Sequence, residues 1–415
     1  MLQFISLESK VKNNVSHSDY WWGNEYQTIS SKSKVLKSYD FRFADPKRPT
    51  GSFPIPENYF DTFVLPKIDI NPVWKSNVFI AHTHKPNIVV LGSPELVGHL
   101  VHRAGISLER IKFVALQEWQ VKAVQTVHPT MKKEQIQQIK VKGSQMESLK
   151  SNLTEDQYDA VIMNPDWDLT GKFVDIANTI VKPTGTIVVI HDAKYANDHN
   201  WNRVAEFEYT GNSFANVQLT SAVTVLKKQD VSETLLKDAT GNMMAVLPET
   251  IKVGPAVDLA KWHFTNTVLG YGLEGYESYT GSLDRQDMNV SQKADAIQVV
   301  QTVGRKADPL NIVSVDSSLH SQIVGVDEIM VVVGVDYEPG KLGPLKIKPK
   351  GVGIGNRVRG IPAKNMADAK RIIDHLQSSE VGILVSVLKG YTAKNGVKTF
   401  RQIPQHNEQF NWKKV

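Results

Sequence analysis

The tetrapeptide Asn164-Pro165-Asp166-Trp167 combines residue types that can do chemistry at one point of the chain. It directly follows an apolar run, 160–163, that is typical of a buried strand. The side-chain oxygen of Asn164 and the backbone carbonyl of Pro165 are two acceptors on a rigid turn, so together they can hold both hydrogens of an amino group. Trp167 offers a flat face on which a heterocycle can stack, worth about 1–3 kcal/mol. The tetrapeptide therefore predicts a catalytic site for the exocyclic amine of an aromatic ring.

Apolar strands alternate with amphipathic stretches between residues 86 and 228, and they must position this turn. That alternation predicts an α/β fold with a doubly wound, mainly parallel sheet. In such sheets ligands bind at the carboxyl ends of the strands, which is where the tetrapeptide lies. The expected strands are 87–91, 112–116, 139–141, 158–163 and 186–190, with a late pair at 205–209 and 222–227, and the expected helices are 94–104, 120–127 and 172–181.

The residue composition and the hydrophobic pattern of the sequence change twice along the chain. Residues 1–85 are rich in Ser, Lys, Pro and aromatics, and they predict an irregular N-terminal segment. Residues 86–228 form the expected sheet domain. From 229 to 415 the pattern is β-rich with glycine turns, and it includes an amphipathic helix at 366–377, so we expect an α+β domain with its boundary near residue 228.

Composition excludes several classes of protein. The chain has 415 residues, 41% of them hydrophobic, and no cysteine, which excludes disulfides, a thiolate nucleophile and any metal site that needs cysteine ligands. No apolar run is long enough to span a bilayer and the N-terminus lacks a signal peptide, so we expect a cytosolic protein. His82 and His84 have the i,i+2 spacing of two metal ligands, but no third ligand accompanies them, so no metal site is predicted.

Positive charge is concentrated at the C-terminal end. Residues 331–415 carry 15 basic and six acidic residues, a net charge of +9, whereas the chain as a whole carries +5 and the remaining residues therefore carry −4. A polyanion such as nucleic acid is a natural partner for a basic pole, because neutralised phosphates release condensed counterions. A solubilising surface is the alternative. Within residues 331–415, glycines interleave with five basic residues that are predicted to contact the phosphates or a groove of nucleic acid. They are Lys346, Lys348, Lys350, Arg357 and Arg359.

The opening tetrapeptide resembles the D/N/S-P-P-F/Y/W motif of DNA amino-methyltransferases that use S-adenosylmethionine. The run "YDAVIMNPDW", a helix and then "VKPTGTIVVI" is similar to the catalytic strand, helix and KPGG strand of that family. In this chain, the stretch 207–228 is similar to the late strand pair of adenine-specific methylases of the type II restriction-modification group. The stretch 365–404 is similar to the closing helices of their target-recognition region. The resemblance implies adenine-N6 methylation of a flipped base in double-stranded DNA, with S-adenosylmethionine as cofactor, in a bacterial or phage-infected cell.

The chain departs from this family in two places. Asp166 replaces the second proline of the motif, which adds a negative charge beside the expected base. The glycine-rich turn expected after the first strand is also missing. By position, the cofactor would be held by Gly92 and Ser93, by Glu118 at the end of the second strand, and by Ser144 and Gln145 after the third.

Three alternatives remain open at the level of the sequence. A rival alignment treats 93–101 as the helix before the first strand and makes 113–119 that strand. A second alternative is a catalytically inactive member of the fold that binds DNA but no cofactor. A third changes the substrate to RNA, a protein amide or cytosine. A partner chain or a homodimer is compatible with each of them.

Overall fold

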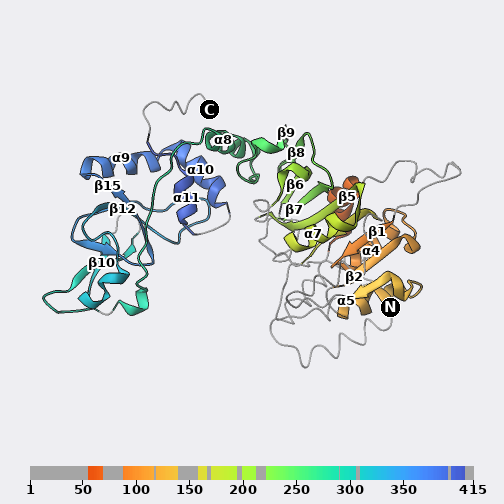
Figure 1. Cartoon of the computed structure of the whole chain (residues 1–415), viewed down its shortest axis with the longest axis horizontal. Helices are drawn as coiled ribbons and strands as arrows, with labels where there is room; N and C mark the ends of the chain where they lie inside the picture. The colour runs from red at the N-terminus through yellow and green to blue at the C-terminus, as the bar shows by residue number, and fades with distance from the viewer. Residues whose placement is uncertain are drawn as a thin grey trace. The chain divides into compact units, whose positions relative to one another are not determined.

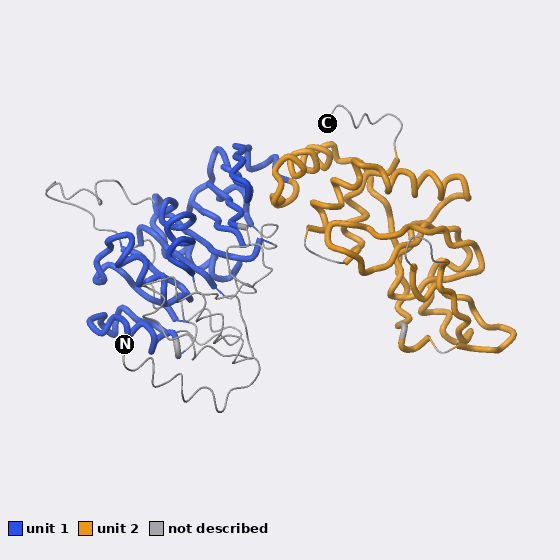
Figure 2. The backbone as a smooth tube through the Cα atoms, turned by 180° about the vertical axis from the view of Figure 1, so that it is seen from behind, with its two compact units in different colours: residues 1–251 blue, residues 252–415 orange. Residues whose placement is uncertain are grey.

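The computed structural model of the chain describes residues 55–68, 87–115, 118–138, 158–165, 170–193, 199–211, 221–288, 290–304, 309–390 and 394–406. The chain divides into two compact units, residues 1–251 and 252–415 (Figure 2). Two strands between residue 228, where the sequence predicts a boundary, and residue 251 belong to the sheet of the first unit.

Among the described residues, one nine-stranded sheet organises the first unit, and several of its strands are labelled in Figure 1. Its strand order is β3-β2-β1-β4-β5-β7-β6-β8-β9. Strands β1 to β5 run parallel to one another, whereas β7 is antiparallel to both β5 and β6. The strands are β1 (Ile88–Leu91), β2 (Ile111–Ala115), β3 (Ile136–Gln138), β4 (Tyr158–Met163), β5 (Val181–Asp192), β6 (Val204–Gly211), β7 (Ser221–Lys227), β8 (Thr234–Lys237) and β9 (Met243–Val246).

The order of the first seven strands is that of a Rossmann-like methyltransferase sheet, and it confirms the predicted α/β fold. All four residues of β1 are buried, as are the last four of β4, because both faces of the sheet are covered. Strand β1 lies between β2 and β4, where the first strand of a doubly wound sheet belongs. The alignment that begins the sheet at residue 87 is therefore correct, and the rival alignment is wrong.

Helices cover the two faces of this sheet. Helices α4 (Pro94–His102) and α5 (Glu118–Val127) contribute buried residues to one core cluster, which also contains alternate residues of β1 and β4. Helix α7 (Thr170–Ile180) follows β4 and packs on β5, and its buried residues lie outside that cluster. The third strand begins three residues before its predicted start at residue 139, and residues 139–150 lie outside the described part of the chain.

A short helical stretch before the sheet is part of the same core, which the sequence did not predict. Helix α3 (Glu57–Tyr59) continues through further helical turns to Lys67. Its apolar residues are buried against α4, and the ammonium group of Lys67 is ion-paired with Glu206 and Glu208 of β6. Part of the segment predicted to be irregular is thus an integral layer of the first unit.

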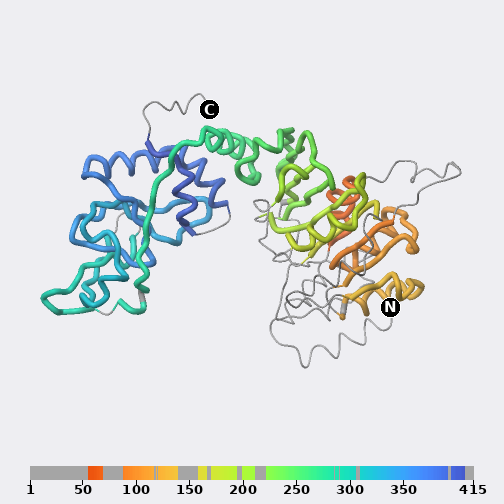
Figure 3. The backbone as a smooth tube through the Cα atoms, viewed as in Figure 1, coloured from red at the N-terminus to blue at the C-terminus, as the bar shows by residue number. Residues whose placement is uncertain are grey.

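The second unit is coloured green to blue in Figure 3. Its described residues form two three-stranded sheets and four α-helices. One sheet has the order β11-β10-β14 and the other β13-β12-β15. Helices α9, α10 and α11 share a core with one face of the second sheet, and the first sheet packs on its other face. The elements are α8 (Leu259–Gly270), β10 (Ile297–Val303), β11 (Leu310–Val315), β12 (Ile329–Gly334), β13 (Lys346–Lys348), β14 (Val352–Ile354), β15 (Val358–Ala363), α9 (Met366–Leu376), α10 (Ser379–Lys389) and α11 (Val397–Gln402).

Candidate active site

The turn after β4 lies directly beside the turn after β1. Asn164 is 1% exposed, and its backbone N–H donates to the carbonyl of Leu91 over 3.3 Å. Its side-chain Nδ2 donates to the hydroxyl Oγ of Ser93 over 3.1 Å. The structure therefore joins a residue predicted to hold the substrate amine to a residue predicted to hold the cofactor. Pro165 is also buried, whereas Asp166 and Trp167 lie outside the described residues.

The turn after β1 depends on Gly92, which has a φ of 86°, a conformation that favours glycine. Its N–H donates to the carbonyl of Val114 over 3.0 Å, and the side chain of Gln120 donates to its carbonyl oxygen. Gln120 is 2% exposed and was not predicted from the sequence. Gly92 is thus held on both sides, and this fixes where α4 begins.

The first turn of α4 faces the same edge of the sheet. Ser93 is its N-cap residue but makes no side-chain capping bond, and its hydroxyl accepts the bond from Asn164. The N-terminal N–H groups of a helix and its dipole favour a negatively charged group. A carboxylate or phosphate therefore suits this position.

Glu95, in that first turn, is a buried acid that the sequence analysis missed. It is 1% exposed; Oε1 accepts a bond from the N–H of Ile55 over 3.1 Å, and Oε2 has no hydrogen-bond partner among the described residues. Burial raises the pKa of Glu95 to about 7. One turn further on, burial lowers the pKa of His99 to about 4, so the neutral imidazole donates from Nε2 to the carbonyl of Ile55 over 2.6 Å. Both side chains thus anchor the stretch 55–68 on α4.

The remaining predicted cofactor residues are less closely placed. Glu118 begins α5 just beyond β2, as the prediction requires, but its carboxylate is exposed and forms an ion pair with Lys122 over 2.8 Å. Ser144 and Gln145 lie outside the described residues. Gly92, Ser93 and Asn164 are therefore the predicted residues that the structure brings together.

The five predicted basic residues do not form one surface. Lys346 and Lys348 pair with Val332 and Met330 of β12, whereas Arg359 pairs with Val333 and so lies on the opposite face of that sheet. Lys350 is exposed in the turn after β13. The remaining member, Arg357, is an exposed residue before β15.

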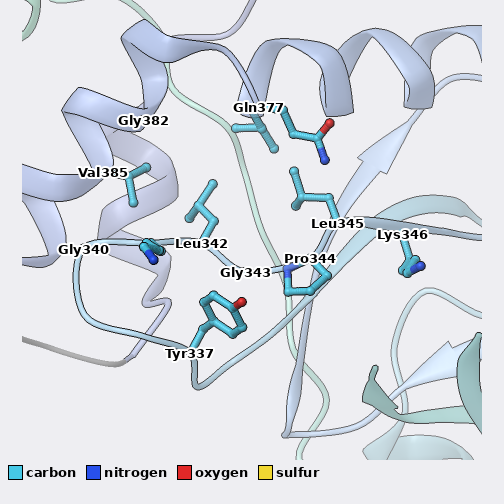
Figure 4. A pocket seen from close by; sticks show the side chains of 12 residues that line it. Tyr337, Gly340, Leu342, Gly343, Pro344, Leu345, Lys346, Gln377, Gly382 and Val385 are labelled. Atoms are coloured by element: carbon cyan, nitrogen blue, oxygen red, sulfur yellow. The ribbon is translucent and has the colours of Figure 1, made fainter. Parts of the chain in front are cut away.

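Burial and pairing limit what these side chains can contact. Lys348 is 0% exposed and Arg359 only 8%, so neither presents its charge to a phosphate, and we withdraw that expectation for both. Arg357 is ion-paired with Asp336 over 3.2 Å. Lys346 lines a pocket between the loop that begins at Tyr337, the C-terminal end of α9 and the first two turns of α10 (Figure 4). Lys350 is therefore the predicted contact that the structure leaves most accessible.

Among the described residues, no group of three or more His, Cys, Asp or Glu side chains could hold a metal ion. In the same part of the chain, no helix is both long and apolar enough to cross a membrane.

Comparisons with known proteins gave likenesses of fold alone. No family model and no curated protein matches the sequence. Among solved structures, the chain resembles the type IIL restriction-modification enzyme MmeI in complex with DNA, with 8% identity, a TM-score of 0.47, and 78% of this chain and 63% of that chain covered. It also resembles the type IIG restriction endonuclease BpuSI (10% identity, TM-score 0.40, 86% and 59% covered). A third structure is the methyltransferase subunit of a type I restriction-modification system from Streptococcus thermophilus (12% identity, TM-score 0.30, 39% and 44% covered). The chain thus spans less than two thirds of the length of each of these proteins.

Proposed function

We propose that the chain transfers a methyl group from S-adenosylmethionine to the N6 amino group of adenine in double-stranded DNA. The observation that carries this proposal is the 3.1 Å hydrogen bond from Asn164 Nδ2 to Ser93 Oγ. It ties the turn that would hold an amine to the turn that would hold the cofactor, at the carboxyl edge of a methyltransferase-like sheet. Substrate and cofactor would therefore meet where such sheets bind their ligands.

The residues after β1 fit S-adenosylmethionine at three points. The uncapped first turn of α4 suits the cofactor's carboxylate, and Gly92 leaves room for the close approach of a ligand to the backbone. The unpartnered, buried Oε2 of Glu95 is an acceptor for a positively charged part of the cofactor. Glu118 would accept bonds from the ribose hydroxyls in place of its ion pair with Lys122. When bound, the cofactor supplies an electrophilic methyl group.

The chain's own part in the reaction is to hold and orient the amine. The side-chain oxygen of Asn164 and the carbonyl of Pro165 accept the two amine hydrogens, which turns the nitrogen lone pair out of conjugation with the ring. The bond to Ser93 fixes the Asn164 amide, so the acceptors are oriented before the base arrives. Trp167 would stack on the flipped base, which must leave the duplex at a cost of a few kcal/mol.

The choice of adenine and of DNA follows from the tetrapeptide and from the charge of the C-terminal end. The tetrapeptide resembles that of adenine methylases, and the net charge of +9 on residues 331–415 suits a polyanion. The proposed partners are double-stranded DNA and a partner chain or a second copy of this chain. Methylation of RNA, a protein amide or cytosine is the competing substrate assignment.

The test is transfer of labelled methyl groups to duplex DNA by the purified full chain, with the product base identified by mass spectrometry. Wild type should yield N6-methyladenine, and Asn164→Ala should abolish transfer. Asn311→Ala, an exposed amide in β11, is the matched control and should retain activity. Ser93→Ala keeps both acceptors but frees the Asn164 amide, and should slow transfer about 10-fold.

Each contrary result has a distinct meaning. DNA binding without cofactor binding or transfer would identify the catalytically inactive alternative. A labelled cytosine would retain the site and correct the base. Thermal unfolding of each variant separates loss of chemistry from loss of fold.

A further inference from the structure

The hydrogen bond between Ser93 and Asn164 can run in either of two directions. A hydroxyl group both donates and accepts, and the two ends of an asparagine amide have almost the same shape. In the structure Asn164 Nδ2 donates to Ser93 Oγ over 3.1 Å, which turns the side-chain oxygen Oδ1 of Asn164 away from Ser93. If Ser93 donated to Oδ1 instead, it would occupy the oxygen that is needed to hold an amine. The direction of this one bond therefore sets the orientation of the acceptor.

Glu95 lies two residues after Ser93 and can determine that direction. Both side chains are 1% exposed. Glu95 Oε1 accepts a hydrogen bond from the N–H of Ile55 over 3.1 Å, which holds the carboxylate in place. Oε2 has no hydrogen-bond partner among the described residues, so it can accept the hydrogen of the Ser93 hydroxyl. An ionised carboxylate only accepts, so this hydrogen points to Glu95 and leaves Ser93 Oγ as an acceptor for Asn164.

Protonation of Glu95 reverses this preference. Burial raises the pKa of Glu95 to about 7, and hydrogen bonds, including one from Ser93, oppose that rise. The carboxyl group therefore gains or loses its proton near neutral pH. Once protonated, it can donate to Ser93 Oγ, and the hydrogen of the serine is then free to turn to Asn164 Oδ1.

The charged and titratable groups around Glu95 do not set its affinity for the proton. One turn further along α4, His99 is neutral because burial lowers its pKa to about 4. The shift in the pKa of Glu95 comes from burial and from hydrogen bonds, not from the charge of a neighbour. The other such groups on or beside α4 and on the elements packed against it are Glu57, Asp61, His102, Arg103, Lys112, Glu118, Lys122 and His128.

We propose that Glu95 is a positioning residue that orients the Asn164 amide through the Ser93 hydroxyl, and that loss of its proton turns the amide to the orientation that holds the amine. We call these three residues the relay. The relay rests on the proposed function, because it takes Asn164 as the residue that holds the amine. Glu95 touches neither the reacting nitrogen nor the methyl group in this role. Its carboxylate can still accept a bond from the cofactor, because each carboxylate oxygen has two lone pairs.

The test follows the side-chain NH₂ group of Asn164 by NMR, in the full chain isotope-labelled at asparagine side-chain nitrogens, without cofactor or DNA. The signal is assigned by its absence in Asn164→Ala. Its chemical shift should change with pH in wild type, with one midpoint at about pH 7. Glu95→Gln should abolish this change, and Ser93→Ala should remove most of it. His102→Gln removes an exposed imidazole from the same helix and should leave the midpoint unchanged.

Methyl transfer should depend on the same proton. At saturating cofactor, kcat of wild type should be about 9-fold higher at about pH 8 than at about pH 6, because an acid with a pKa of about 7 is about 90% ionised at the first pH and about 10% at the second. Glu95→Gln and Ser93→Ala should both give flat pH profiles. Ser93→Ala keeps the Glu95 carboxylate, so a role of Glu95 in cofactor binding alone would leave the profile of this variant unchanged and would contradict the relay.

The outcomes separate this inference from the proposed function. An Asn164 signal that does not move between about pH 5 and about pH 9 in wild type, or that moves equally in Ser93→Ala, would overturn the relay even if the chain transfers methyl groups. A signal whose movement requires both Glu95 and Ser93, in a chain that transfers no methyl group, would support the relay and overturn the proposed function alone. Thermal unfolding checks the fold of each variant, and Ser93→Ala decides the test if Glu95→Gln does not fold.

Discussion

His191 should remain neutral in the folded protein well below the pH at which a free histidine becomes charged. It is 0% exposed at the carboxyl end of β5, where Nδ1 donates to the carbonyl of Asp192 over 2.9 Å and Nε2 lies 2.7 Å from Thr224 Oγ1. The Nε2 of His199 is only 3.2 Å from the same Nε2. Burial lowers the pKa of His191 to about 4 and that of His199 well below its usual value. If both imidazoles carried a positive charge at this distance, their repulsion would be strongly unfavourable.

The consequence is a proton that is taken up on unfolding. At about pH 5, a group with a pKa of about 4 is roughly 10% protonated, whereas an unfolded histidine of pKa about 6.5 is almost fully protonated. Unfolding should therefore add about 0.9 proton at His191. The folded pKa lies below the unfolded one, so this stabilisation is complete above about pH 6.5 and falls as the pH drops towards 4. By about pH 5 the loss amounts to about 2 kcal/mol.

The assay is proton uptake when the whole chain unfolds in guanidinium chloride at about pH 5. His191→Gln should lower the uptake by about one proton relative to wild type. His263→Gln, an exposed histidine on α8, is the matched control and should produce a much smaller change. If His191→Gln leaves proton uptake unchanged, His191 is charged in the folded state and the hydrogen bonds described at the end of β5 are wrong.

Two stability predictions follow from close contacts in the first unit. Lys67→Met should lower the free energy of unfolding by about 3 kcal/mol, because it leaves the carboxylates of Glu206 and Glu208 without their shared buried ammonium. Urea unfolding measures this change. An unfolding free energy equal to that of wild type would mean that Lys237 alone neutralises the two carboxylates. Gly185→Ala should cost about 1–3 kcal/mol, since its Cβ would lie 2.5 Å from a side-chain atom of the same strand, whereas Gly171→Ala in α7 should stabilise by about 0.5–1 kcal/mol. Equal melting temperatures for the two alanine variants would contradict this packing.

The sheet was predictable because its central strands are continuous apolar runs. Parallel strands covered on both faces need hydrophobic residues at every position, so 158–163 was recognised with its observed bounds. Its neighbour β5 was predicted too short because its first residues, including Lys182 and Gly185, do not look like a strand. Their place is decided by tertiary contacts, such as the 2.7 Å ion pair of Lys182 with Asp159.

Contacts between distant residues explain what the sequence concealed. The stretch 55–68 has no clear period, and it is fixed by Glu95 and His99, which hold Ile55 from about forty residues away. Lys348 looked like a surface lysine because lysine is rarely buried. Nothing local indicates that its buried ammonium donates to four backbone carbonyls, those of Gly325, Glu328, Pro349 and Val352. The strands β8 and β9 are short and half exposed, so their addition to the first sheet has no strong local signal.

The candidate site was predictable where residue types alone decide the chemistry. Asn164 and Gly92 were found from their positions at strand ends, and the structure places their turns side by side. Gln120 and Glu95 were missed, because a polar residue in an amphipathic helix is normally exposed. Burial of a helical Glu with a raised pKa is visible only once the opposing layer is known.

Binding of S-adenosylmethionine to the purified chain, measured by isothermal titration calorimetry with and without duplex DNA, tests the central claim most directly. We predict one cofactor per chain, with binding weakened in Ser93→Ala, because Ser93 lies between α4 and Asn164. Absence of binding by wild type under both conditions would contradict the account, and would leave a methyltransferase-like sheet that does not serve methyl transfer.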